Sequence, residues 1–321
     1  MIMTPSTETE TPMVECAYLY PTEAVLHEMG PGHPERPERV RAIDRALAER
    51  GLLDRMIRLT PEPAPETALR RAHDASYLRS LEAAQPAPGD YRWLDGDTAM
   101  NAHSWRAARL AAGAGLVAVD AIMAGMAQRA FCNVRPPGHH AERERAMGFC
   151  LVNNIAVAAA HALEAHGLDR VAIVDFDVHH GNGTEDIIAD QPRVLLCSTF
   201  QSPLYPYRGV DTRSDHIVNV PLPAGADGAA YRKAFTARVL PALGRFAPEL
   251  VLFSAGFDAH RDDPLAGMNL VEDDYYWVTR TVLETTRESS RGRALSFLEG
   301  GYDLDALARS ACRHVEALLA A

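Results

Sequence analysis

The chain has 321 residues, and 43 acidic against 32 basic residues give it a formal net charge of −11. This acidic balance argues against direct nucleic-acid binding and against attachment to an anionic membrane surface. Lysine occurs once, as Lys233, which we expect to be an ordinary surface charge on a helix. A P-loop and a Schiff-base lysine are therefore excluded.

The cysteines and the N-terminal residues indicate the cellular compartment of the protein. Cysteine occurs at positions 16, 132, 150, 197 and 312, without a CxxC pair, which fits a reducing compartment, so we expect a cytoplasmic protein. Residues 1–12 are polar and acidic, unlike a signal peptide. We expect them to form a disordered tail that precedes a single domain over 13–321. No apolar run approaches the roughly 20 residues that cross a bilayer.

Short apolar runs alternate along the chain with longer segments of helical period. The predicted strands are Ala130–Val134, Val171–Val174, Val194–Ser198, Leu250–Ser254 and Ala294–Leu298. The predicted helices span about 103–128, 152–166, 231–245, 273–288 and 303–319. This alternation predicts an α/β fold with a central parallel sheet and helices on both faces. Because ligands bind beyond the carboxyl ends of such strands, we expect the active site there.

The strand that ends near residue 174 runs into the segment DFDVHH. Side chains in an extended chain repeat every two residues, so Asp175, Asp177 and His179 point to one side. Asp258, which follows another buried strand, is the natural third metal ligand. Asp177, His179 and Asp258 would bind a divalent ion such as zinc and leave a position open for water, as catalytic sites do. The alternative is that these acids cap helices or form ion pairs.

The strand that ends near residue 134 runs into RPPGHH, which carries adjacent histidines. Beside a metal-bound water, His139 and His140 suit general base and acid catalysis. Asp175 and Asn182 are available to orient their rings. The last strand runs into EGGY, where Tyr302 can donate a hydrogen bond to an oxyanion and the two glycines allow a close approach of the backbone.

Together these motifs resemble the zinc-dependent histone deacetylases, a family that also holds bacterial deacetylase-like amidohydrolases and acetylpolyamine amidohydrolases. The resemblance runs through HPERPERVRAI, RPPGHH, MGFCLVNN, VDFDVHHGNGT, SAGFDAHRDDPLAG and LEGGY, which span nearly the whole chain. It implies an arginase-deacetylase fold and hydrolysis of an acetamide.

The resemblance also implies a role for each site residue. Asp177, His179 and Asp258 match the zinc ligands, with Fe²⁺ as the alternative metal in the cell. His140 matches the general base and acid, whereas His139, oriented by Asp175, contributes electrostatically. Tyr302 matches the tyrosine that polarises the acetyl carbonyl.

One residue indicates the branch of the family. The HHGNGT pattern, with Asn182, resembles class II enzymes, whereas class I enzymes usually carry Asp at this point. A neutral Asn partner gives His140 a lower pKa than an Asp partner would.

Further positions match substrate-binding residues of the family. Phe149 and Tyr205 match the aromatic walls of the acyl-lysine tunnel, where Phe is more usual than Tyr at the second position. Asp97 is near the place where related enzymes hold the substrate backbone. Gly300 is also expected beside the substrate. Leu265 falls where a polyamine-specific relative has Glu and where lysine deacetylases have Leu.

A structural potassium ion is a further implication of the resemblance. The family holds it mostly by backbone oxygens, at positions that correspond to Asp175, Asp177, His179 and Ser198.

The substrate stays open between an acetylated peptide or protein and an acetylated polyamine, with Leu265 favouring the former. Glu142 or Glu144 could supply the acidic group that a polyamine requires. Competing hypotheses are a binuclear manganese ureohydrolase, whose extra carboxylates the DVHHGNG loop lacks, and a non-catalytic module that binds acyl ligands. The oligomeric state is also open, a homo-oligomer included.

Overall fold

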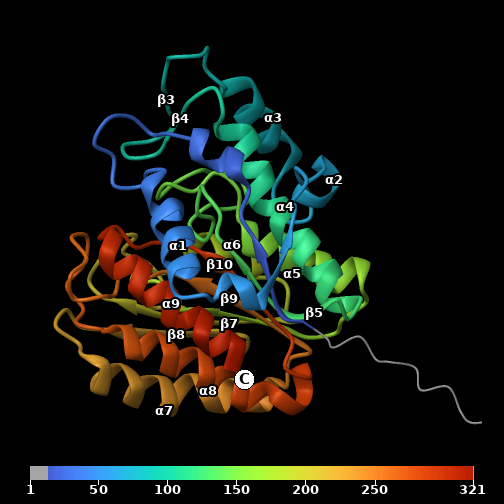
Figure 1. Ribbon diagram of the computed structural model, residues 1–321, viewed down its shortest axis with the longest axis vertical. Coiled ribbons are helices and arrows are strands. Elements are labelled where there is room, and N and C mark those ends of the chain that lie inside the picture. The colour runs from blue at the N-terminus through green and yellow to red at the C-terminus, as the bar shows by residue number, and fades with distance from the viewer. Residues whose placement is uncertain (1–13, 321) are drawn as a thin grey trace, which may run out of the picture.

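A parallel sheet of eight strands forms the centre of the computed structural model, which describes residues 14–320 (Figure 1). Its strands follow the order β2-β1-β5-β10-β9-β6-β7-β8, and each adjacent pair is parallel. The tail expected over residues 1–12 lies outside the described residues. The predicted parallel α/β sheet is confirmed.

The strands of this sheet are β1 Val14–Leu19, β2 Met56–Leu59, β5 Ala127–Cys132, β6 Val171–Asp175, β7 Val194–Gln201, β8 Ile217–Leu222, β9 Leu250–Ala255 and β10 Ala294–Leu298. Two short strands, β3 Arg92–Trp93 and β4 Ala99–Met100, pair antiparallel to each other outside it. All five predicted strands exist. The prediction missed β1 and the two edge strands, of which β2 is short and β8 contains Pro221, a residue that sheets tolerate mainly at an edge.

The helices are α1 Glu38–Glu49, α2 Glu66–Leu69, α3 Ala75–Ala84, α4 Ser104–Met123, α5 Asn154–Ala165, α6 Asn182–Ile188, α7 Gly228–Phe246, α8 Glu272–Ser290 and α9 Leu304–Ala320, with short 3-10 turns at Thr22–Leu26 and Leu53–Arg55. The helix predicted over 103–128 is too long at its end. Gly125 has a left-handed φ of 73°, and the Met126 amide donates back to the Ala121 carbonyl, which closes α4 before β5 begins.

Helices cover both faces of the sheet, as Figure 1 shows: α4 and α5 lie on one side, and α1, α7, α8 and α9 on the other. Alternate side chains of each strand pack into two hydrophobic cores, one on each face of the sheet. In β6, Ile173 packs toward α4 and α5, whereas Ala172 and Val174 pack toward the other layer. The central strands are buried on both faces, which explains their continuous apolar sequence.

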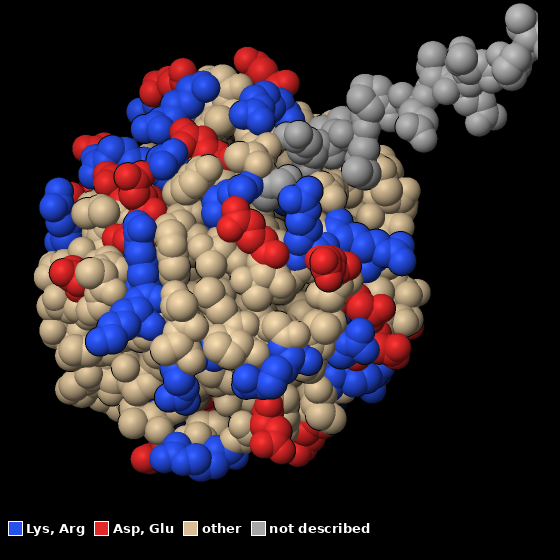
Figure 2. Space-filling view, turned by 90° about the horizontal axis from the view of Figure 1, so that it is seen from below, with Lys and Arg blue, Asp and Glu red and all other residues tan. Residues whose placement is uncertain are grey.

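The molecular surface is charged but mixed in sign on the face drawn in Figure 2, where Lys and Arg side chains are interspersed with Asp and Glu. Lys233 is exposed on α7, as expected. Within residues 14–320, no helix combines the length and the apolar character needed to span a membrane.

Candidate active site

Three metal-ligand candidates meet at the carboxyl ends of two neighbouring strands. Asp177 and His179 follow β6, and Asp258 follows β9, which pairs with β6 in the sheet. One ligand atom of each residue lies within 4.8 Å of those of the other two. His179 Nδ1 is 3.1 Å from Asp177 Oδ1 and 3.2 Å from Asp258 Oδ2. The structure therefore brings the predicted metal ligands together.

The chemistry of this cluster fits a cation. Asp258 Oδ2 is buried, and although His179 Nδ1 lies 3.2 Å away, no donor within residues 14–320 makes a well-formed hydrogen bond to it, so this carboxylate oxygen is available to a cation. Burial alone would lower the pKa of His179, but Asp177 and Asp258 outweigh it and raise this pKa to about 10. Two carboxylates and an imidazole in a water-poor site match the ligand set of a divalent ion such as zinc.

Backbone groups fix the carboxylates in place. The Gly300 amide donates to Asp177 Oδ2 at 2.8 Å, and the Val178 amide donates to Asp258 Oδ1 at 2.9 Å. A Cβ at Gly300 would lie only 2.0 Å from Asp258 Oδ2, so no other residue fits there without movement. Gly300, expected beside the substrate, thus packs behind Asp177 and Asp258 and does not line the cavity described below.

The two adjacent histidines lie beside this cluster with different partners. His139 Nδ1 donates to Asp175 Oδ2 at 3.0 Å, and His140 Nδ1 donates to Asn182 Oδ1 at 2.8 Å. Burial opposes a charge on His139, but Asp175, Asp177 and Glu299 raise its pKa well above the ordinary value. Burial, followed by His139 and His179, holds the pKa of His140 well below the ordinary value. In these surroundings His139 favours the imidazolium form and His140 the neutral base.

The partner of His140 is itself held in one orientation. Asn182 Nδ2 donates to Glu142 Oε1 at 2.8 Å, and because a carboxylate only accepts, the Asn182 oxygen must face His140. The proton of the neutral His140 ring is thereby placed on Nδ1, which leaves Nε2 with the lone pair that a base requires. Glu142 also pairs with Arg208 at 2.9 Å, so the group that orients the partner of His140 is itself fixed. No local sequence pattern predicts this contact between Glu142 and Asn182, which spans 40 positions.

Glu299, in the EGGY segment, is a second residue that holds the loops of the site together. Its Oε2 accepts hydrogen bonds from the Gly138 amide at 2.7 Å and from the His139 amide at 3.1 Å, across about 160 positions of the chain. Burial raises its pKa to about 7. Glu299 therefore connects the loop after β10 to the loop after β5. Its position directly after a buried strand is the feature of the sequence that indicates a role in the site.

Arg39, in the HPERPER segment, supports the loop that carries Tyr302. It is fully buried, donates from Nε to the Gly301 carbonyl at 2.7 Å and from Nη2 to the Glu299 carbonyl, and lies 4.9 Å from the centre of the Tyr302 ring. Glu35 forms ion pairs with both Arg39, at 3.2 Å, and Arg135, at 2.5 Å. This buried ionic network explains why so polar a segment belongs to the core of the site.

A cavity of about 230 Å³ leads to the histidines and is lined by Asp97, His140, Gly148, Phe149, His179, Leu204, Tyr205, Tyr207, Leu265 and Tyr302. The Phe149 and Tyr302 rings meet edge to face at 5.9 Å, and Tyr205 meets His140 at 5.3 Å. The structure therefore places the predicted aromatic walls, Asp97, Leu265 and Tyr302 around one cavity. Glu142 and Glu144 are not among the described residues that line it.

Asp97 is attached to the aromatic wall through its neighbour. Thr98 Oγ1 donates to Asp97 Oδ1 at 3.1 Å and accepts from the Phe149 amide at 3.0 Å. His33 Nε2 lies 3.1 Å from the Asp97 carbonyl oxygen and completes the support of this loop. Burial, followed by Asp95, raises the pKa of the Asp97 carboxyl.

Comparisons with known proteins agree with this geometry. A family model described as "Histone deacetylase domain" matches residues 33–318. A histone deacetylase-like amidohydrolase of Pseudomonas aeruginosa is 40% identical over 278 residues, which cover 84% of this chain and 73% of that protein. The polyamine deacetylase HDAC10 of Homo sapiens is 38% identical over 302 residues, which cover 89% of this chain and 44% of that protein.

The fold is shared with a solved structure. The crystal structure of the HDA15 HD domain superimposes with a TM-score of 0.89 and 36% sequence identity, covering 95% of this chain and 89% of that chain. The expected arginase-deacetylase fold is confirmed. With a family model matched over nearly its whole length, the chain belongs to the histone deacetylase family and is a hydrolytic deacetylase.

Proposed function

We propose that the protein is a zinc-dependent deacetylase whose preferred substrate is acetyl-lysine in a peptide or protein. The observation that carries the substrate class is Leu265, an apolar side chain in the cavity wall. An extended acyl-lysine side chain is apolar along its methylenes and suits the Phe149 and Tyr205 rings. A polyamine would instead place a second ammonium near Leu265.

Asp177, His179 and Asp258 would hold the zinc ion. Zinc in such a site acts as a Lewis acid toward the acetyl oxygen and lowers the pKa of a bound water. Iron(II) is the alternative ion for the same ligands. A structural potassium ion near Asp175, Asp177, His179 and Ser198 stays a prediction from the family.

The side chains of the chain then divide the reaction between them. His140 Nε2 takes the proton of the attacking water and returns it to the departing amine. Nε2 is free to do so because the ring proton is on Nδ1, which donates it to Asn182 Oδ1 in a hydrogen bond. The Tyr302 hydroxyl donates to the oxygen on which negative charge develops. His139, charged by its pairing with Asp175, adds a positive field nearby without exchanging a proton. Acetate and a free amine are the products.

Acetylpolyamine is the alternative substrate, and one observation favours it. Asp97 is the one carboxylate among the described residues that line the cavity, and it could attract a distant ammonium. The other acidic candidates are less suited, because Glu142 is engaged by Asn182 and Arg208, and Glu144 is exposed.

A substrate panel tests the proposal. Protein loaded with zinc, and separately with iron(II), is assayed for acetate release from an acetyl-lysine peptide, N-acetylputrescine and N-acetylspermidine. We expect the highest kcat/KM for the peptide, and loss of turnover in His140→Ala with each substrate. Higher kcat/KM for the polyamines would overturn the substrate assignment and leave the deacetylase chemistry intact. Full activity of protein shown to contain no bound metal would overturn the metal assignment.

A further inference from the structure

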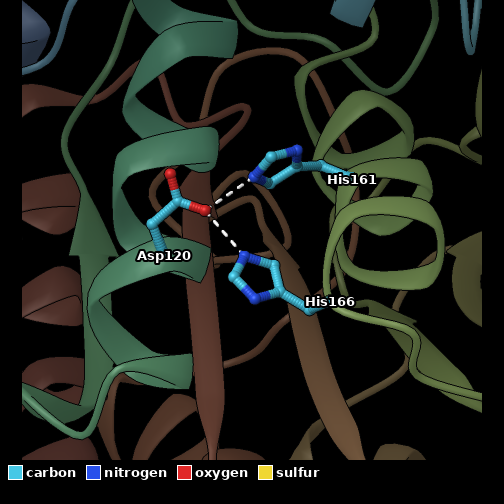
Figure 3. Close-up of side chains that lie close together, drawn as sticks. All are labelled: Asp120, His161 and His166. Carbon is cyan, nitrogen blue, oxygen red and sulfur yellow. Dashed lines mark hydrogen bonds and ion pairs between the residues drawn. The ribbon is translucent and has the colours of Figure 1, made fainter.

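A second cluster of metal-ligating side chains lies outside the active site, between α4 and α5 (Figure 3). Asp120 of α4 faces His161 of α5 and His166, which caps the end of α5. The Nε2 atoms of both rings lie 2.7 Å from one oxygen, Asp120 Oδ1. The three ligand atoms all lie within 4.8 Å of one another.

The fold brings the two histidines to one point although they are five positions apart, a spacing that does not share a helix face. The helix ends at Ala165, Gly167 turns the chain with a left-handed φ of 65°, and the Leu168 amide donates back to the Ala162 carbonyl at 3.3 Å. This turn returns the His166 ring to the His161 ring, with centroids 5.3 Å apart. Both rings therefore aim their Nε2 atoms at the neighbouring helix, as Figure 3 shows.

We propose that Asp120, His161 and His166 form a second site for a divalent transition metal ion, such as zinc, nickel or copper, which links α4 to α5. Two imidazole nitrogens and one carboxylate oxygen are ligands that these ions accept. Partial exposure leaves the remaining coordination positions to water, since the Asp120 side chain is 57% exposed. The site is independent of the proposed deacetylase reaction.

The contacts of His161 show a form of the site in which a proton occupies the ligand nitrogen. Arg71 Nη1 lies 3.0 Å from His161 Nδ1, and because a guanidinium only donates, the proton of the neutral His161 ring sits on Nε2 and points at Asp120. A metal ion that binds Nε2 must replace this proton, and the neutral ring then carries its proton on Nδ1. Because Arg71 donates to Nδ1, the guanidinium must withdraw first. Arg71 keeps a partner when it does, since its Nε lies 2.9 Å from Glu164 Oε2.

The ligands must also move apart. Metal bonds of about 2.0–2.1 Å in tetrahedral geometry separate two ligand atoms by about 3.3 Å. The present 2.7 Å contacts must therefore widen by about 0.6 Å. Asp120, exposed on a helix surface, can withdraw by this amount through its side-chain torsions.

The position of the cluster separates it from catalysis. The active-site loops lie at the carboxyl ends of the strands, and α5 starts there, where Asn154 donates to the Pro136 carbonyl. His161 and His166 lie roughly 10–18 Å further along the axis of that helix, at 1.5 Å per residue. An ion here would hold two helices together and leave the reacting groups untouched.

The test uses untagged protein whose catalytic site is already filled with zinc. Nickel(II) is titrated calorimetrically at about pH 8, and zinc content is measured before and after. We expect one additional ion per chain, a higher Tm with nickel, and loss of both effects in the double variant H161A/H166A and in D120N. His103→Ala, which removes an exposed histidine on α4's amino end, should bind nickel as the wild type does.

Arg71→Ala gives the sharpest outcome. Removing the guanidinium frees His161 Nδ1 to carry the proton, so nickel affinity should rise several-fold. All variants should retain the zinc-dependent deacetylase activity, which shows that they fold. Absence of an additional ion in the wild type, or unchanged nickel binding in H161A/H166A, would overturn the proposal. Weaker nickel binding in Arg71→Ala would overturn the competition between Arg71 and the metal.

Discussion

Replacing Gly300 by alanine tests whether the backbone after β10 sets the geometry of the metal ligands. A Cβ there would lie 2.0 Å from Asp258 Oδ2 and 2.6 Å from Asp177 Oδ2, whereas ordinary contacts begin at 3.4 Å. The Asp258 oxygen must therefore retreat by 3.4 − 2.0 = 1.4 Å, or the loop must shift by as much. Metal bonds tolerate only about ±0.2 Å. We expect metal affinity to fall by more than the roughly 10–100-fold that loss of a supporting contact costs.

The assay is metal content after dialysis against a graded series of chelator concentrations, followed by kcat on an acetyl-lysine peptide. Gly244→Ala is the matched control, because Gly244 lies within α7 with nothing within 4 Å of its added Cβ. That variant should bind metal normally and gain about 0.5–1 kcal/mol of stability. Wild-type metal affinity and turnover in a folded Gly300→Ala protein would refute the reasoning.

Three further predictions address the acid, the tyrosine and the substrate. Tyr302→Phe should lower kcat by about 10²–10³, or about 2.7–4 kcal/mol, with metal content unchanged; near wild-type turnover would remove the oxyanion role. The pKa of Glu299 is raised to about 7 from 4.5, so the protonated carboxyl stabilises the folded state. This stabilisation is complete below pH 4.5 and is lost as the pH rises through 7. Glu299→Gln cannot titrate, so its stability relative to wild type, measured as the free energy of urea unfolding, should be greater at about pH 8 than at about pH 5. A difference in stability that does not change with pH would contradict this titration. Leu265→Glu should raise the ratio of kcat/KM for N-acetylspermidine to kcat/KM for an acetyl-lysine peptide about five-fold over wild type, since a charge pair near the surface contributes about 1 kcal/mol; an unchanged ratio would show that Leu265 does not face the distant amine.

The sequence predicts the interior of this fold better than its edges. Central strands such as β9 and β10 are buried on both faces, so hydrophobicity alone marks them. The strands β2 and β8 are partly exposed and carry polar residues or proline, which no apolar run reveals. Helix α1 is also missed, because its buried positions include Arg39, whose backbone acceptors at Glu299 and Gly301 lie more than 250 residues away.

For the site, the residues that follow strands are predictable, because topology places those loops at one edge of the sheet. The residues that hold these groups in place are not. Glu142 orients Asn182 across 40 positions, and Glu35 pairs with Arg135 across 100. Such contacts depend on which loops become neighbours, and local sequence patterns do not contain that information.

The place of β10 in the sheet has a consequence for how the protein is made. This strand, the last among residues 14–320, lies between β5, whose loop carries His139 and His140, and β9, whose loop carries Asp258. Before residues 294–298 leave the ribosome, the nascent chain can form only two half-sheets with open edges. A fragment that ends before β10 therefore lacks the strand that joins the loop of His139 and His140 to the loop of Asp258.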